Sequence, residues 1–241
     1  MRMKTVFSTL IIVCLTGQTR ADMLFEYDIC SNSSSSISAS SLAEHVLAGS
    51  LAASGVDVLT GYGDGIFTAS AWSESSTRDT SRYYQWSASA ETGLAIDYES
   101  VDLSLTRGHY LSEHGAETWQ LCASTDAFAS SDILLQTWDI SATDFDSVTV
   151  LAGQDISVLG TLPGTVTFRL YGFDADHAGQ SGDYSGLAYA HPDLTGSGCN
   201  LSMYGQSVPE PTTLGFLTIG ALAMLRRKRT PHRNNNANQC P

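Results

Sequence analysis

The chain has 241 residues, of which 25 are acidic and 12 basic, and its formal net charge at pH 7 is −13. The basic residues lie mostly at the two ends, because residues 22–207 hold 24 acidic residues and only four arginines, a net charge of 4 minus 24, or −20. Such a surface repels phosphates and anionic headgroups, which excludes nucleic-acid binding and leaves divalent cations, cationic partners or neutral polysaccharide as ligand classes, or a surface that is simply soluble.

The first 21 residues have the three parts of a secretory signal peptide. Met1–Lys4 is basic, Val6–Leu15 is apolar, and Ala21 offers a small residue at a cleavage site. We therefore expect residues 1–21 to form a signal helix that is removed during export. Residues 22–207 would then fold outside the cytoplasm, where cysteines oxidise.

The exported region has the pattern of short strands. Apolar and polar residues alternate in several segments, and turns rich in Gly, Ser and Asp separate them. A period of two is typical of half-buried antiparallel sheet. The sequence predicts an all-β fold, an antiparallel two-sheet sandwich of the jelly-roll kind, for residues 22–207. The alternating segments are residues 84–90, 101–106, 119–124 and 166–171.

Two segments near the start of this domain are less regular. Ser31–Ser41 is rich in serine, which predicts a loop. Leu42–Ala53 is rich in Ala and Leu and fits either a helix or a pair of strands. Trp86 and Trp119 are in phase with the aliphatic residues of their strands, so we expect both in the core.

The chain has no recognisable catalytic motif. Its histidines are scattered without metal-ligand spacing, and no Gly-x-Ser-x-Gly elbow or phosphate loop occurs. Asp144 and Asp146 form a carboxylate pair of the kind that a glycosidase uses, but close pairs arise by chance among so many acids. We therefore expect a protein that is not an enzyme and has no cofactor, with a glycan-active enzyme as the lesser alternative.

One acidic loop is a candidate calcium site. Asp174, Asp176 and Asp183 follow a well-patterned strand, and Ca²⁺ prefers six to eight oxygen ligands. Ala178 and Ser185 stand where an EF-hand needs ligands, which rejects that motif. An irregular calcium site at the rim of the sandwich and a solvated acidic turn remain as alternatives.

Three cysteines remain after both ends of the chain are removed. Cys30 and Cys199 flank the first and last predicted strands, which often lie side by side in sandwiches, so we predict a Cys30–Cys199 disulfide. Cys122 would then be a lone thiol on the Gln120/Ser124 face of its strand.

The C-terminal region combines a rigid turn, an apolar run and a basic cluster. Val208 precedes the turn, which is formed by Pro209, Glu210 and Pro211. The apolar run of residues 212–225 would be a helix of about 21 Å, short for a bilayer core of ~30 Å. The basic cluster lengthens the span and marks its cytoplasmic side, and it consists of Arg226, Arg227, Lys228 and Arg229. The polar, Asn-rich tail of residues 230–241 is predicted to be disordered.

This C-terminal arrangement resembles the PEP-CTERM sorting signal of Gram-negative bacteria that make exopolysaccharide. The resemblance implies that an exosortase recognises the Pro-Glu-Pro element at residues 209–211, removes the tail, and sorts the protein from the inner membrane to the cell surface or extracellular matrix. Segments such as Leu24–Asp28 and Val166–Phe173 are also similar, more loosely, to a β-sandwich ectodomain that is common in front of this signal.

Two classes of function remain open. The first is a structural or interaction protein of the matrix, and the second is a carbohydrate-binding module that acts on exopolysaccharide through stacked aromatic side chains. Exposed, coplanar tyrosines would favour sugar binding, whereas buried or scattered ones would favour a structural role. The side chains in question are Trp72, Trp86, Trp119 and Trp138, with Tyr62, Tyr110, Tyr184 and Tyr189.

Overall fold

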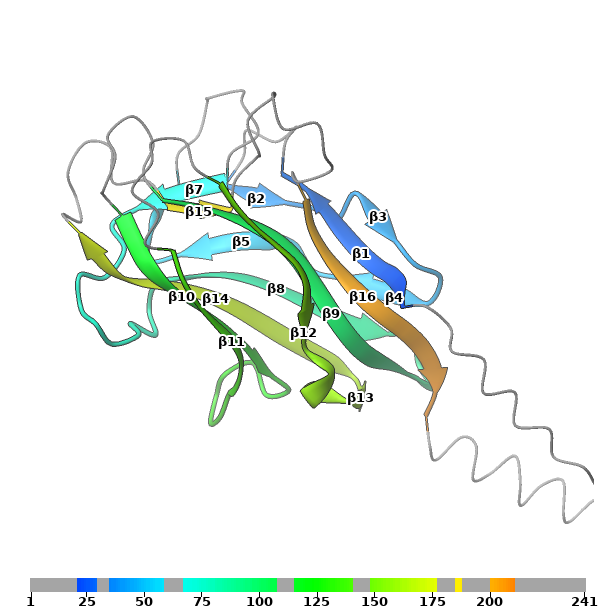
Figure 1. Ribbon diagram of the computed structural model, residues 1–241. Helices are drawn as coiled ribbons and strands as arrows, with labels where there is room; N and C mark the ends of the chain where they lie inside the picture. Colours follow the sequence, from blue (N-terminus) through cyan, green and yellow to red (C-terminus); the bar gives the residue numbers. More distant parts are fainter. Residues whose placement is uncertain are drawn as a thin grey trace, which may run out of the picture.

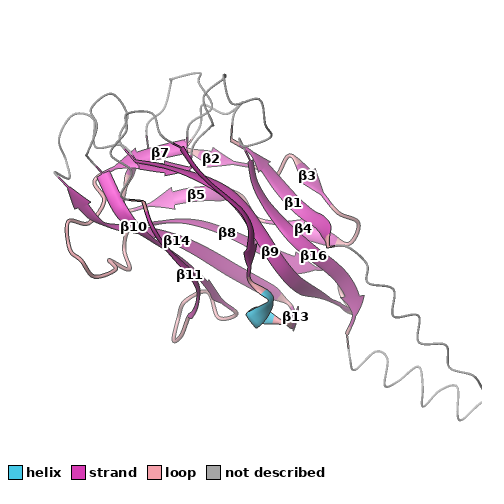
Figure 2. Cartoon of the chain, viewed as in Figure 1, coloured by secondary structure: helices cyan, strands magenta, loops and turns pink. Residues whose placement is uncertain are grey.

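The structure is a computed structural model that describes residues 21–29, 35–58, 67–107, 115–140, 148–176, 185–187 and 200–210. Within these ranges the chain forms two antiparallel sheets packed face to face, and its only helical element is a short 3₁₀ turn, η1 (Ser157–Leu159) (Figures 1 and 2). The predicted all-β sandwich is therefore confirmed. The predicted signal helix and C-terminal membrane helix lie outside the described residues, and no helix in the described part is long and apolar enough to cross a membrane.

The first sheet is organised around its longest strand, β9 (Leu94–Arg107). The strands β16 and β15 pair with one edge of β9, and β12 and β13 pair with the other edge. The sheet order is β3-β1-β16-β9-β15-β7-β6. The bounds are β1 (Asp22–Asp28), β3 (Ser41–Leu42), β6 (Asp57–Val58), β7 (Phe67–Ser70), β12 (Val148–Asp155), β13 (Thr161–Pro163), β15 (Ser185–Leu187) and β16 (Asn200–Pro209).

The second sheet has the order β11-β10-β14-β8-β5-β2, with β4 also paired to β8. The predicted alternating segments fall in β8, β9, β10 and β14, so those strands are confirmed. Leu42–Ala53 forms strands and no helix, and the predicted serine loop contains β2 and the start of β3. The bounds are β2 (Ser36–Ile37), β4 (Val46–Ala48), β5 (Leu51–Ser54), β8 (Tyr83–Ala90), β10 (Gly115–Ser124), β11 (Ile133–Asp139) and β14 (Thr165–Asp176).

Large aromatic side chains fill the space between the sheets. Trp72, Trp86 and Trp119 are almost completely buried, as the alternation predicted for the last two. The ring of Trp72 lies edge-on to that of Trp119 at 5.0 Å, and Gly172 opposite leaves room for both indoles. Truncating one such tryptophan to alanine typically costs about 3–5 kcal/mol, so this cluster is a main source of stability.

The two ends of the sandwich differ in what they carry. At one end, which we call the exit end, β1 begins at Asp22 and β16 finishes at Pro209 (Figure 1). At the opposite end, which we call the far end, β9 finishes at Arg107 and β14 finishes at Asp176. Both termini of the domain therefore leave from the same end.

Candidate functional site: the exit end

The last strand runs directly into the predicted sorting signal. Val208 is opposite Ala95 and Pro209 is opposite Leu94 in the β16–β9 pair. The sandwich therefore extends two residues into the predicted sorting signal, and the prediction of a turn is wrong for Pro209, which lies in the strand.

Hydrogen bonding explains why a proline is tolerated here. The Glu210 N–H donates to Gly93 O at 3.2 Å, so the backbone N–H of Glu210 points toward the start of β9. Backbone groups in an antiparallel strand alternate in direction, which points those of Val208 toward β9 and the nitrogen of Pro209 away from it. A proline fits a strand where no ladder hydrogen bond is needed from its nitrogen.

The turn between β8 and β9 supports this junction. Within the turn, Leu94 N–H donates to Glu91 O at 3.0 Å, and Glu91 N–H donates to His45 O at 3.0 Å. The side chains of His45 and Glu91 also meet, with Nδ1 and Oε2 2.9 Å apart, and this hydrogen bond raises the pKa of His45. Gly93 has φ of +87°, a conformation that favours glycine. Tertiary contacts thus fix the turn that holds Glu210.

A close approach of backbones lies just before the junction. The pairing of β16 with β9 shifts register between Tyr204 and Gly205. A Cβ atom at Gly205 would collide with the carbonyl oxygen of Asp97. After this bulge, Ser207 is paired with the core residue Ile96, and its Oγ is buried without a hydrogen-bond partner among the described residues. The glycine is therefore needed for β16 to reach the exit end in this register.

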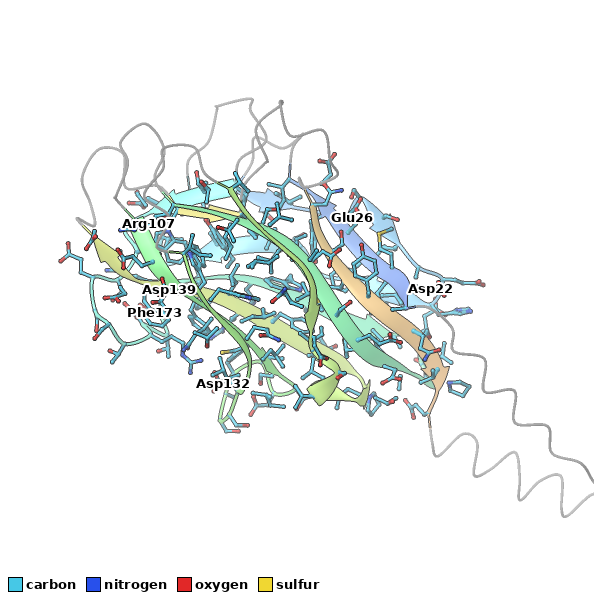
Figure 3. The ribbon with its side chains drawn as sticks, in the orientation of Figure 1. Asp22, Glu26, Arg107, Asp132, Asp139 and Phe173 are labelled. Atoms are coloured by element: carbon cyan, nitrogen blue, oxygen red, sulfur yellow. The ribbon has the colours of Figure 1, made fainter. Side chains whose placement is uncertain are left out.

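The far end contains a buried arginine that joins the two sheets. Arg107 from β9 forms ion pairs with Glu117 of β10 and with Asp176 of β14, the latter at 3.0 Å (Figure 3 labels Arg107). The Arg107 side chain is only 4% exposed, against 28% for Glu117. Burial raises the pKa of Glu117, Arg107 opposes that rise, and Asp176 and Asp174 add to it.

This ion pair bears on the predicted calcium site. Asp176 already has a cationic partner in Arg107, while Asp183 lies outside the described residues. Asp174 has φ of +56°, and its N–H donates to Ser75 O at 2.9 Å. In the described part of the chain, no group of three or more His, Cys, Asp or Glu side chains is arranged to hold a metal ion.

A second buried cluster covers the outer face of the β10–β14 pair. Cys122 is fully buried there beside Tyr171 and Phe173, on the opposite face of β10 from its core residues (Figure 3 labels Phe173). Arg78 Nη1 donates to Cys122 Sγ at 2.7 Å and pairs with Asp132 at 2.8 Å. Burial raises the pKa of the Cys122 thiol to about 12. This cysteine is therefore an unreactive packing residue.

All four arginines of residues 22–207 are engaged within the domain. Besides Arg78 and Arg107, Arg82 donates to Ala71 O at 2.6 Å and to Trp72 O at 2.9 Å. Arg169 donates to Gln85 Oε1 at 2.8 Å and lies over the ring of Tyr83 at 4.0 Å. The positive charge of the domain therefore serves its own packing, and the remaining surface is acidic.

The aromatic residues proposed for sugar stacking are not available on the described surface. All four tryptophans are buried, and the other described phenylalanine and tyrosine side chains are buried or half-buried. Tyr62, Tyr110, Tyr184 and Tyr189 lie outside the described residues. The half-buried aromatic side chains of the described part are Tyr83, Phe128 and Tyr204, and the first two pack against the Cys122 cluster.

Several other predicted residues also lie outside the described part: Asp144, Asp146, Cys30, Cys199, Pro211, Arg226, Arg227, Lys228 and Arg229. For the two cysteines the neighbouring strands are informative, because Asp28 of β1 is directly paired with Asn200 of β16. The disulfide remains a prediction.

A family model described as the PEP-CTERM protein-sorting motif matches residues 207–229. The chain carries a PEP-CTERM sorting motif. This motif is consistent with an exosortase substrate, an exported protein whose precursor has a C-terminal membrane anchor. No curated protein and no solved structure gives a significant match to the chain. The matched range begins at Ser207, so the first residues of the PEP-CTERM motif are residues of β16.

Sequence reasoning missed the part of this site that comes from elsewhere in the chain. Glu91, Gly93 and His45 support the junction, but they lie more than 100 residues before the motif. The Glu91-Thr92-Gly93 sequence between two alternating segments indicates a tight turn, yet nothing in it indicates which other strand it contacts.

Proposed function

We propose that the protein is a non-enzymatic cell-surface or extracellular-matrix protein, which an exosortase releases from its C-terminal membrane anchor. The observation that carries this proposal is the PEP-CTERM match at residues 207–229, directly continuous with the last strand of an all-β domain. Such a domain needs no cofactor or catalytic centre to serve as a building element outside the cell.

The charge distribution limits the partners of such a protein. The four arginines are used in internal contacts, so the outer surface of a domain with net charge −20 repels other copies and anionic polymers and favours cationic partners, divalent cations or neutral polysaccharide. At the far end, the close carboxylates of Glu117 and Asp176 both pair with Arg107, which favours a role in joining the two sheets.

The test follows the mass of the protein in a Gram-negative host with an exosortase and in the same host without it. With the enzyme, the surface or matrix fraction should contain a product that begins at Asp22 and lacks Arg226–Pro241. Without it, the tail should be retained in the membrane fraction. A product that keeps Arg226–Pro241 in both hosts contradicts the proposal.

A motif variant separates sorting from export. Replacing Pro209, Glu210 and Pro211 together with alanine should leave signal-peptide removal unchanged and abolish tail removal. Incubating the purified product with the host's exopolysaccharide should release no reducing ends; release that depends on Asp144 and Asp146 would favour the glycosidase alternative instead.

A further inference from the structure

One edge of β16 is open where the sorting motif begins. β1 pairs with β16 only as far as Asp22 opposite Gly205, whereas β9 pairs with β16 as far as Pro209. Among the described residues, no strand pairs with the second edge of Gln206–Pro209. We call this four-residue stretch the open edge.

The alternation of backbone groups shows what the open edge presents. The backbone N–H of Glu210 points to β9, and backbone groups alternate in direction along a strand. The N–H and C=O groups of Val208 and Gln206 therefore also point to β9. The N–H and C=O of Ser207 and the C=O of Pro209 therefore point to the open edge. One donor and two acceptors in an extended backbone are the groups to which an added strand binds.

The open edge also stands next to the new N-terminus. The predicted signal-peptide cut falls after Ala21, and Asp22 is the first residue of β1. With the cut at that position, β1 begins at the N-terminus of the exported protein, and no preceding residue is left to pair with the open edge.

We propose that the processing enzyme docks on the open edge by adding an extended segment of its own as a strand beside Gln206–Pro209. This inference rests on the proposed function. Two observations favour this occupant. The open edge overlaps the start of the matched PEP-CTERM motif, and the other edge of the same residues is already paired with β9. Among the described residues, the open edge is the part of the folded motif whose backbone groups have no strand partner.

Covering the edge without touching the motif tests the proposal. A variant with Thr-Val-Thr-Val inserted between Ala21 and Asp22 extends β1 beside Gln206–Pro209, while a Gly-Pro-Gly-Pro insertion of the same length cannot pair there. Pulse–chase in the exosortase host then measures tail removal, with signal-peptide removal as the measure of export. We expect the pairing insertion to slow tail removal by about 30- to 150-fold, as for the loss of two or three backbone hydrogen bonds, and the control to match the native chain.

A second pair of variants changes the open edge itself. Ser207→Pro removes the only N–H that faces the edge and leaves the hydrogen bonds to β9 in place, whereas Ser207→Ala keeps that N–H. Slow tail removal in Ser207→Pro alone supports strand addition. Equal rates of tail removal for the two insertions, or for the two Ser207 variants, overturn strand addition. That result would favour an enzyme that binds residues 206–209 as a peptide detached from β9. Retention of the tail by the native chain contradicts the proposed function itself.

Discussion

Arg107 offers the sharpest test of how the sandwich is held together. Replacing it with methionine keeps most of the buried side-chain volume but removes the guanidinium that faces Glu117 and Asp176. Removing one partner of a buried ion pair costs about 3–5 kcal/mol. Because Glu117 is 28% exposed and Asp176 is 59% exposed, water compensates part of that loss, and we expect a loss of about 2–3 kcal/mol at pH 7.

The pH dependence identifies the cause. Burial already raises the pKa of Glu117 and Arg107 opposes this rise, so Arg107→Met should raise that pKa further. The folded state then binds the proton more tightly than the unfolded state, and stability falls as pH rises from the unfolded pKa to the folded one. The loss in free energy of unfolding caused by Arg107→Met should therefore be largest at pH 7 and much smaller near pH 4.

Urea unfolding of the purified exported protein at pH 7 and pH 4 measures both effects. At pH 7 the melting temperature should also fall by roughly 5–10 °C. Adding Glu117→Gln to Arg107→Met should recover part of the loss at pH 7, since the uncompensated carboxylate is gone. A variant as stable as the native protein at pH 7, or a deficit equal at both pH values, would refute this account of the far end.

Three further predictions concern separate parts of the chain. Hydrogen bonds from Ser124, Ser130 and nearby backbone N–H groups lower the pKa of Asp126 to about 2, so Asp126→Asn should reduce stability at pH 7, and calorimetry should show the difference fading as pH falls from about 4 toward 2. Peptide mapping of the non-reduced exported protein should find Cys30 linked to Cys199 and Cys122 as a free thiol; a disulfide that uses Cys122 would contradict the burial described here. Neutral residues in place of Arg226–Arg229 should weaken membrane retention of the precursor in cell fractionation, and unchanged retention would show that the basic cluster does not set its topology.

Much of the sandwich could be predicted because its strands are buried on one face. Trp86, Trp119 and Phe168 alternate with polar residues, and the period of two in the sequence is the period of the pleat. Leu42–Ala53 was ambiguous because its short strands carry small residues that suit a helix equally well. The winding that would make the sandwich a jelly roll stays a prediction.

The exit end was harder to predict for a local reason. Leu201 and Met203 give the first half of the last strand a clear apolar phase. Gly205 and Ser207 continue that phase, because the extra residue at the register shift is Glu99 of β9, but neither of them carries an apolar side chain. Alternation thus fails at the residues that join the fold to the motif, and only the pairing with β9 shows that the strand continues.

The position of β16 between β1 and β9 has a mechanical consequence for an anchored precursor. β1 pairs with Asn200–Gly205 and β9 with Ser202–Pro209, so every residue of the strand has a partner on at least one side. Tension between the membrane and a contact at the far end would act along β16 and shear these hydrogen bonds together, whereas a strand pulled sideways would lose them one at a time. The anchor is thus attached to the domain in the direction in which a sheet resists load best.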